Sequence, residues 1–159
     1  MKFGSILGGL LPKSGSTVDA ASAATASRPD RGVLVVEDDG FYASLLVRAG
    51  ERLKEAVSTA RNVEEAENLA RRFRYKTMFV DHYMVGGNGE AFVRFLKDNN
   101  LAGTTRIFVM TGENPAVVAL KYVGMPVDEF LKKPIPVDRL VELLRLPPRA
   151  DDGGTAPPV

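Results

Sequence analysis

Met78-Phe79-Val80-Asp81-His82-Tyr83-Met84 is the most informative stretch of the sequence, because three apolar residues lead directly into a carboxylate and glycines follow at 86, 87 and 89. A short, continuous apolar run is typical of a parallel strand that is buried on both faces. In open α/β sheets, ligands bind at the carboxyl ends of such strands. Asp81 is therefore a candidate functional residue, although an acid at this position can also close a turn or cap the next helix.

The bulk composition excludes several classes of site. The chain has 159 residues, which suits one domain with a sizeable core. Its net charge is +1 with 26% charged residues, so no strong field predicts binding to nucleic acid or acidic lipid. The absence of cysteine excludes disulfides and thiolate chemistry, and it fits a cytoplasmic protein. The single histidine excludes a His-rich metal site, and no apolar run approaches the ~20 residues of a membrane span.

The two ends of the chain differ from the middle. Residues 1–30 are predicted to be a disordered tail, because small and polar residues predominate after Leu11 and cannot bury enough surface to become ordered. The opening residues 1–11 are more apolar, and three readings stay open for them: a disordered tail, a docking or membrane-touching segment, or a secretion signal. Residues 147–159 are predicted to be a second disordered tail, which leaves 31–146 as the folded domain.

Between these tails, short apolar runs alternate with segments whose apolar residues recur at helical spacing. This alternation predicts a doubly wound α/β domain, a five-stranded parallel sheet with helices on both faces. Asn62, Asn88 and Asp39 stand where side chains cap helices. The second strand ends without an obvious polar group, which fits a place at the sheet edge. Strands are expected at 33–36, 57–60, 77–80, 106–110 and 127–131, and helices at 41–56, 64–73, from 88 onward, 115–122 and 137–144.

Polar side chains follow the other four predicted strands: Glu37-Asp38-Asp39, Asp81, Thr111 and Lys133. Because the carboxyl ends of parallel strands meet at one edge, these groups are expected on a single rim. Packed carboxylates repel each other unless one keeps its proton or a cation binds, and an all-oxygen set selects Mg²⁺, or Mn²⁺ in its place. A carboxylate nucleophile, a metal ion, a lysine and a hydroxyl describe a site for phosphoryl transfer onto an aspartate.

With these groups in view, residues 31–146 resemble the receiver domain of two-component response regulators, of the single-domain, CheY-like kind. The resemblance implies a flavodoxin-like receiver fold and a phosphoacceptor site. It rests on four motifs in family order: Val-Leu-Val-Val-Glu-Asp-Asp at 33–39, Phe-Val-Asp-His-Tyr-Met at 79–84 with Gly89 beyond it, Val-Met-Thr-Gly at 109–112, and Phe-Leu-Lys-Lys-Pro at 130–134.

Carried over residue by residue, the resemblance makes Asp81 the phosphoacceptor. It makes Asp38 a direct Mg²⁺ ligand and Glu37 an acid that holds the metal ion largely through water. The backbone carbonyl of Tyr83 is the implied third protein ligand. An aspartate-nucleophile phosphatase is a disfavoured rival, because such enzymes need a second acid where this chain has Tyr83.

The resemblance also makes Thr111 the switch hydroxyl, Lys133 the phosphate-pairing lysine and Phe130 the switch aromatic. Lys133 is chosen over Lys132 because it directly precedes Pro134, where the family's peptide bond is usually cis, and Lys132 is expected to be solvated. Simpler readings stay open: Thr111 as a strand-end hydroxyl bonded to backbone, and Phe130 as part of the core.

The stretch that follows Asp81 departs from the family pattern. Val85 stands where the family usually has proline and two glycines follow it, so a looser loop is expected. Tyr83 is bulky at a position that can screen attacking water. His82 is interpreted as an exposed loop histidine rather than as a relay or metal ligand.

The implied function is that of a single-domain response regulator, because too few residues follow Leu146 for an output domain and no basic recognition helix appears. A histidine kinase or phosphotransfer protein would phosphorylate it, and self-phosphorylation and autodephosphorylation would be its only enzymatic chemistry. The output would be contact with an unknown downstream protein, as a monomer or weak dimer, through a face that includes Tyr122, Val123, Phe130 and Arg139. Two alternatives are a receiver-fold interaction module that works without phosphorylation and a phosphate sink in a phosphorelay.

Overall fold

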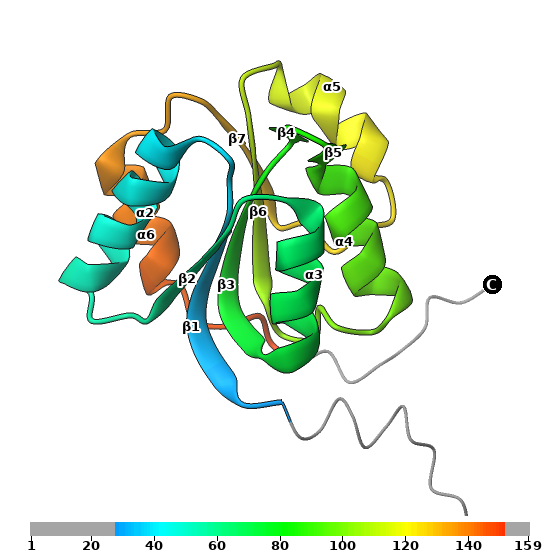
Figure 1. The fold of residues 1–159 in the computed structure, drawn as a ribbon. Coiled ribbons are helices and arrows are strands. Elements are labelled where there is room, and N and C mark those ends of the chain that lie inside the picture. The colour runs from blue at the N-terminus through cyan, green and yellow to red at the C-terminus, as the bar shows by residue number, and fades with distance from the viewer. Residues whose placement is uncertain (1–27, 152–159) are drawn as a thin grey trace, which may run out of the picture.

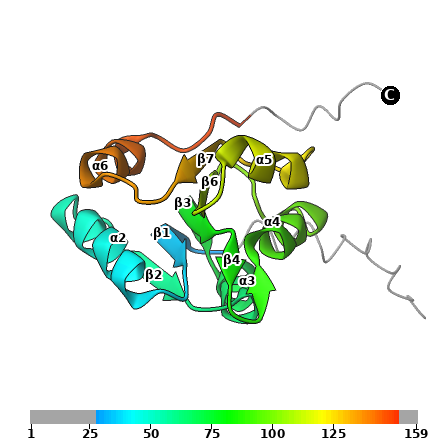
Figure 2. The same ribbon diagram turned by 90° about the horizontal axis from the view of Figure 1, so that it is seen from above.

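The computed structural model describes residues 28–151, and the predictions for residues 1–27 and 152–159 lie outside this range. A five-stranded parallel sheet of order β2-β1-β3-β6-β7 lies between two layers of helices (Figures 1 and 2). This confirms the predicted doubly wound α/β fold, with β2 at the sheet edge. The strands are β1 (Asp30–Val36), β2 (Val57–Ala60), β3 (Arg74–Asp81), β6 (Arg106–Thr111) and β7 (Glu129–Lys132).

Two helices cover one face of the sheet and three cover the other (Figure 2). The first pair is α2 (Gly40–Arg52) and α6 (Val137–Arg145). The second group is α3 (Val63–Arg72), α4 (Gly89–Asp98) and α5 (Pro115–Ala119), which continues into the 3₁₀ turn η1 (Leu120–Tyr122). A separate antiparallel hairpin of β4 (Tyr83–Met84) and β5 (Gly87–Asn88) follows β3 directly.

The apolar runs of the central strands are continuous because both of their faces are buried. Along β1, Val33 and Val35 pack in the cluster formed with α2 and α6, while Leu34 and Val36 pack in the cluster on the other face. Successive side chains of a strand point to opposite faces, so the part of a strand that lies between two helix layers, such as Val33–Val36 of β1, is apolar at successive positions. For this reason the central strands could be predicted from the sequence.

Side-chain caps start four of the helices in the described residues, and three of these caps were predicted. Each capping oxygen accepts a hydrogen bond from a backbone N–H of the first turn, at 2.8–2.9 Å. For the three predicted caps, the acceptor and donor pairs are Asp39 and Phe41 for α2, Asn62 and Glu65 for α3, and Asn88 and Ala91 for α4.

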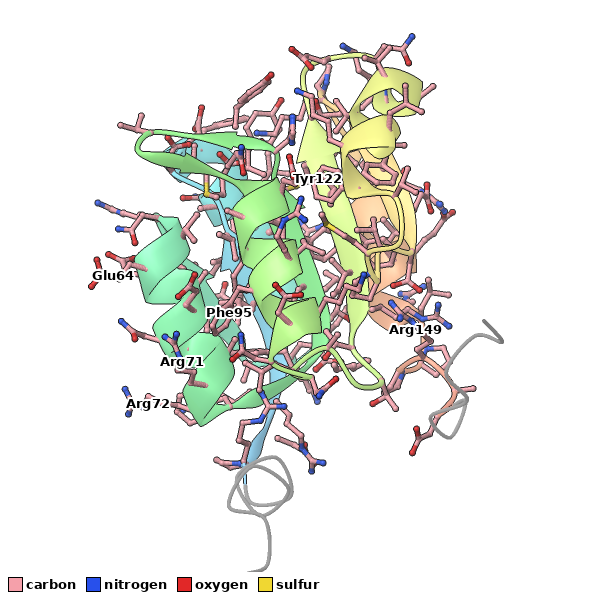
Figure 3. All side chains as sticks on the ribbon, turned by 90° about the vertical axis from the view of Figure 1, so that its right-hand side faces the viewer. Glu64, Arg71, Arg72, Phe95, Tyr122 and Arg149 are labelled. Carbon is pink, nitrogen blue, oxygen red and sulfur yellow. The ribbon has the colours of Figure 1, made fainter. Side chains whose placement is uncertain are left out.

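The α3 and α4 helices pack side by side, with one cation–π contact across their outer surface. The Arg71 guanidinium lies 4.5 Å from the centre of the Phe95 ring, and the two residues are neighbours in Figure 3. The guanidinium also bonds Glu67 one turn earlier on α3, at 3.3 Å. These contacts cover the partly buried Phe95 ring, so the helix pair needs no apolar residue at position 71.

Two strands begin earlier than predicted, because backbone pairing extends into polar residues. The ladder between β1 and β3 starts at the pair Asp30 and Arg74, and the Arg74 Nε lies 2.8 Å from the Asp30 carboxylate. The helix predicted for 41–56 ends at Arg52 instead. Lys54 follows with a positive φ of 57°, which takes the chain out of the helix.

Packed residues extend past the predicted start of the folded domain. Arg28 is 8% exposed, and its guanidinium donates to the backbone carbonyls of Ala70, Phe73 and Leu101. One side chain thereby joins the end of α3 to the loop before β6. The uncapped carbonyls at the end of a helix need donors of this kind.

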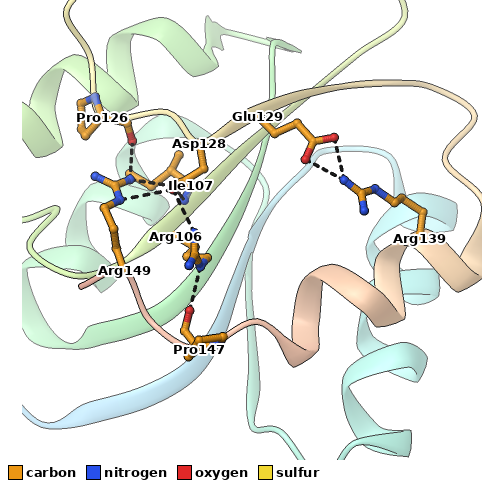
Figure 4. A network of polar contacts seen from close by, with 8 residues as sticks. All are labelled: Arg106, Ile107, Pro126, Asp128, Glu129, Arg139, Pro147 and Arg149. Carbon is orange, nitrogen blue, oxygen red and sulfur yellow. Dashed lines mark hydrogen bonds and ion pairs between the residues drawn. The ribbon is translucent and has the colours of Figure 1, made fainter.

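Packed residues also extend past the predicted end of the domain at 146 (Figure 4). The Arg149 backbone N–H donates to Thr104 at 2.7 Å, and its guanidinium bonds the Asp128 carboxylate at 2.6 Å. Arg106 donates to the carbonyl of Pro147 at 2.7 Å. The chain after α6 is therefore held against the amino ends of β6 and β7.

Gly89, the first residue of α4, lies directly behind the end of β3. A Cβ added at this position would lie 2.5 Å from the carbonyl oxygen of Asp81 and 3.0 Å from the hydroxyl of Tyr122. We expect Gly89→Ala to lower the free energy of unfolding by roughly 1–3 kcal/mol, because the carbonyl belongs to a sheet strand and cannot move freely. Urea denaturation of the metal-free protein measures this change.

Gly40→Ala is the matched control, because Gly40 also opens a helix and an added Cβ there would meet nothing within 4 Å. It is expected to leave stability unchanged or to raise it, since alanine favours the helix by about 1 kcal/mol over glycine. Equal effects of the two substitutions would contradict the steric explanation.

Candidate functional site

The carboxyl ends of β1 and β3 and the segment after β7 bring three acids and a lysine together. One oxygen from each of Glu37, Asp38 and Asp81 lies within 4.8 Å of the other two. The Nζ of Lys133 lies 2.6 Å from the Glu37 carboxylate and 3.2 Å from that of Asp81. The side chains of Glu37 and Asp81 are only 0% and 8% exposed, so this single ammonium is set against two buried acids.

Burial makes these carboxyl groups hard to ionise. It raises the pKa of Glu37 to about 7, with the Lys133 hydrogen bond opposing the rise and the Asp81 charge adding to it. Burial also raises the pKa of Asp81, again opposed by Lys133. The pKa of Lys133 is itself raised, because its contacts with the two acids outweigh its own burial. The cluster is thus short of positive charge, which a divalent cation would supply.

Asp38 is held by the loop that follows β3. Its Oδ2 accepts a hydrogen bond of 2.8 Å from the backbone N–H of Val85. Proline, the residue that the family usually has at this position, lacks an N–H and could not make this bond. The loop that the sequence predicted to be loose is a short hairpin, with Gly86 at a positive φ of 81° in its turn.

Thr111 is the last residue of β6, and Phe130 lies inside β7, two residues before its end. The buried Thr111 hydroxyl accepts a hydrogen bond of 3.0 Å from the Glu113 backbone N–H, so the backbone contact considered for it is present. Phe130 is half-buried, and its ring lies 5.2 Å from that of Tyr122 in an edge-to-face arrangement. Their switch roles remain predictions, as does the carbonyl of Tyr83 as a metal ligand.

The two lysines lie in different environments, and the phosphate-pairing role of Lys133 remains a prediction. Lys132 is exposed and donates to the carbonyl of Gly112, whereas Lys133 is directed at the acids. The Lys133–Pro134 peptide bond is cis, as the resemblance implied.

The prediction of an exposed His82 was wrong. This residue is 1% exposed, and its Nδ1 lies 2.8 Å from the hydroxyl of Tyr122, which is itself buried between α4 and α5 (Figure 3). Burial lowers the pKa of His82, and the nearby charge of Lys121 lowers it further. A buried histidine needs a hydrogen-bond partner, and this partner stands 40 positions away, so no local pattern could have revealed it.

We expect Tyr122→Phe to lower the free energy of unfolding by roughly 1–3 kcal/mol, because the buried Nδ1 of His82 loses its partner. Tyr83→Phe is the matched control. Tyr83 is 52% exposed and its hydroxyl lies 3.3 Å from Lys121, so this change should stay within about 0.5 kcal/mol. Thermal or urea denaturation distinguishes the two outcomes, and a neutral Tyr122→Phe would show that the bond does not stabilise the fold.

Glu37 should make the stability of the metal-free protein fall as the pH rises. Its pKa is about 7 in the fold against 4.5 in the unfolded reference, so the unfolded chain releases this proton first. Between about pH 4.5 and 7 the folded state therefore loses up to about 3 kcal/mol relative to the unfolded state. Denaturation in EDTA at pH 5 and pH 8, for the wild type and Glu37→Gln, measures this effect. A stability difference between them that does not change with pH would contradict it.

Comparison with known proteins agrees with this geometry. The family model described as "Response regulator receiver domain" matches residues 33–145. The chain belongs to the response regulator receiver family. A curated relative, the photosynthetic apparatus regulatory protein RegA of Cereibacter sphaeroides, is 28% identical over 115 residues, or 72% of this chain and 61% of RegA. The chain thus spans about three fifths of the length of the curated relatives it matches.

Solved receiver structures share the fold. A response regulator from Burkholderia pseudomallei, with a phosphorylated aspartic acid, a calcium ion and citrate, is 28% identical and has a TM-score of 0.63, covering 73% of this chain and 67% of the other. The Vibrio cholerae chemotaxis protein CheY4 is 22% identical with a TM-score of 0.66, covering 72% and 95% respectively. At this lower identity the likeness shows the fold alone.

Receiver domains are signalling domains that bind Mg²⁺ in an acidic pocket. The donor set of this chain fits such an ion, because it consists of carboxylate oxygens and lacks cysteine and histidine. Within residues 28–151, no helix is both long enough and apolar enough to cross a membrane.

Proposed function

We propose that this receiver domain accepts a phosphoryl group on Asp81 from the phosphohistidine of a histidine kinase or phosphotransfer protein. The observation that carries the proposal is the double contact of the Lys133 ammonium with Asp81 and Glu37, with Asp38 alongside. A buried acid with a cation beside it and two further acids is equipped to receive a phosphate group and a metal ion together.

The chemistry begins when an oxygen of the ionised Asp81 carboxylate attacks phosphorus. The new P–O bond forms as the P–N bond of phosphohistidine breaks, and the imidazole nitrogen keeps the electron pair and takes a proton from solvent. Asp38 would hold Mg²⁺ directly, Glu37 largely through water, and the Tyr83 carbonyl would complete the protein ligands. When bound, the ion supplies positive charge that offsets the phosphoryl oxygens.

Three residues of this chain then change their contacts in response to the negative charge of the phosphoryl group. Lys133 exchanges its contact with Asp81 for one with a phosphoryl oxygen, which keeps the ammonium paired. The Thr111 hydroxyl gives up the Glu113 N–H and donates to another phosphoryl oxygen. Phe130, half-buried against Tyr122, packs inward behind it.

The output surface follows from these movements. It comprises η1, β7 and the start of α6, where Val123 is 78% exposed and Arg139 bonds both oxygens of Glu129 at 2.7 and 2.9 Å (Figure 4). A shift of Phe130 changes the packing of the side chains beneath this surface, and it thereby changes the affinity of the surface for a downstream protein. We propose that output occurs by such contact, in the cytoplasm, by a monomer or weak dimer, without nucleic acid.

Incubation with Mg²⁺ and acetyl phosphate tests the acceptor directly. Intact mass spectrometry should show one added phosphoryl group on the wild type and none on Asp81→Asn, because an amide cannot form the acyl phosphate. EDTA should abolish the adduct. Asp39→Asn is the matched control: it changes the neighbouring exposed acid, whose role is to cap α2, and asparagine caps equally well.

Two results would reject the proposal. Absence of an adduct on the folded wild type would favour a receiver-fold interaction module that works without phosphorylation. An adduct that persists in Asp81→Asn would place the acceptor elsewhere. A pull-down that compares the phosphorylated protein with Asp81→Asn then tests output by contact, and a phosphate sink would retain no partner selectively.

A further inference from the structure

Lys133 has a third neighbour that the family resemblance did not assign. Its Nζ lies 4.4 Å from the centre of the Tyr42 ring, in addition to its contacts with Glu37 and Asp81. Tyr42 is half-buried in the first turn of α2, a helix that covers the same sheet face as α6 (Figure 2). An aromatic ring and two carboxylates therefore surround the ammonium.

The arrangement matches the bonding capacity of an ammonium group. Lysine carries three N–H donors, of which Glu37 and Asp81 can take two. The Lys133 side chain is only 14% exposed, so water has limited access to the third. The negative face of an aromatic ring attracts a cation at this distance. The ring carries no net charge, so it does not neutralise the ammonium that the carboxylates bind.

A lysine at a phosphoryl site must be confined to be effective. Its four-carbon stem has many rotamers. Restricting them during the reaction adds to the activation free energy, unless other contacts already hold the side chain in place. We propose that Tyr42 is a positioning residue that confines the Lys133 ammonium to the acceptor carboxylate, ready to pair with the incoming phosphoryl group. This inference rests on the proposed function of Asp81.

The chemistry of the ring predicts which substitutions matter. Phenylalanine keeps the aromatic face, so Tyr42→Phe should behave like the wild type. Leucine fills part of the volume but has no quadrupole to attract a cation, so Tyr42→Leu should release the ammonium. Tyr42→Met is a second variant without a ring, and its flexible side chain adapts to the space. Phe41→Leu is the matched control, because it removes an adjacent, 69% exposed ring that lies edge-to-face with Tyr42 at 5.7 Å, and it leaves the Tyr42 ring in place.

The first measurement is the exchange of the Lys133 ammonium protons with water, followed by ¹H–¹⁵N NMR of the metal-free protein. The signal is assigned by its loss in Lys133→Arg. We expect exchange to become roughly fivefold faster in Tyr42→Leu and Tyr42→Met, from a partly desolvated cation–π contact. Tyr42→Phe and Phe41→Leu should match the wild type. Methyl signals of Leu46, which is buried on the same helix, report whether α2 is intact.

The second measurement is the rate of phosphorylation by acetyl phosphate at saturating Mg²⁺. It should fall roughly fivefold in Tyr42→Leu and Tyr42→Met and be restored in Tyr42→Phe. A general structural role would make Tyr42→Phe and Phe41→Leu fail together or would move the Leu46 signals. Unchanged ammonium exchange in both variants that lack the ring would overturn the inference.

The two proposals fail in different ways. If Asp81 takes no phosphoryl group, the proposed function fails, while ammonium exchange still shows whether Tyr42 confines Lys133. If phosphorylation occurs and the exchange rate is insensitive to the ring at position 42, the acceptor role stands and the positioning role is lost.

Discussion

The ion pairs of the Lys133 ammonium with the carboxylates of Glu37 and Asp81 are the interaction on which the architecture of the site depends. Glu37 follows β1 and Asp81 is the last residue of β3, which are neighbours in the sheet, and the lysine follows β7, two strands beyond β3. The parallel arrangement of the sheet brings the carboxyl ends of these three strands to one edge. Burial of two acids against one cation is unfavourable, as the raised pKa of Glu37 shows. The fold therefore maintains a deficit of positive charge, and a metal ion bound among these acids would relieve it.

The elements around the acids fix the positions of side chains by packing and hydrogen bonding, rather than by charge. Gly89 lets the start of α4 lie against the carbonyl of Asp81, and the same close approach admits the hydroxyl of Tyr122. That hydroxyl bonds His82, and the Tyr122 ring packs against Phe130. A continuous set of contacts thus runs from His82, the residue after Asp81, through Tyr122 to Phe130 in β7.

The strand pattern and the cluster of acids were legible in the sequence because both arise from local rules. The doubly buried part of a strand, such as Val33–Val36 of β1, is apolar at successive positions, and the topology then fixes where Asp81 and Lys133 meet. The burial of His82 and Arg28 was not legible, because their partners stand 40 or more positions away in sequence. Polar side chains that are buried through distant hydrogen bonds look the same in sequence as exposed ones.

Two contacts distinguish this site from one built of charges alone. The Val85 N–H holds Asp38, and the Tyr42 ring faces Lys133. Both partners are neutral, so each confines a charged side chain without cancelling its charge. A charged partner in either place would compete with the incoming metal ion or phosphoryl group and would have to be displaced at a cost of several kcal/mol. Neutral contacts are weaker, on the order of 1 kcal/mol each, and they would leave Asp38 and Lys133 free to exchange partners in the proposed phosphorylation of Asp81. Tyr42 and Val85, the latter standing where the family usually has proline, therefore fit the proposed phosphoryl-acceptor site, which must be ordered before transfer and able to rearrange after it.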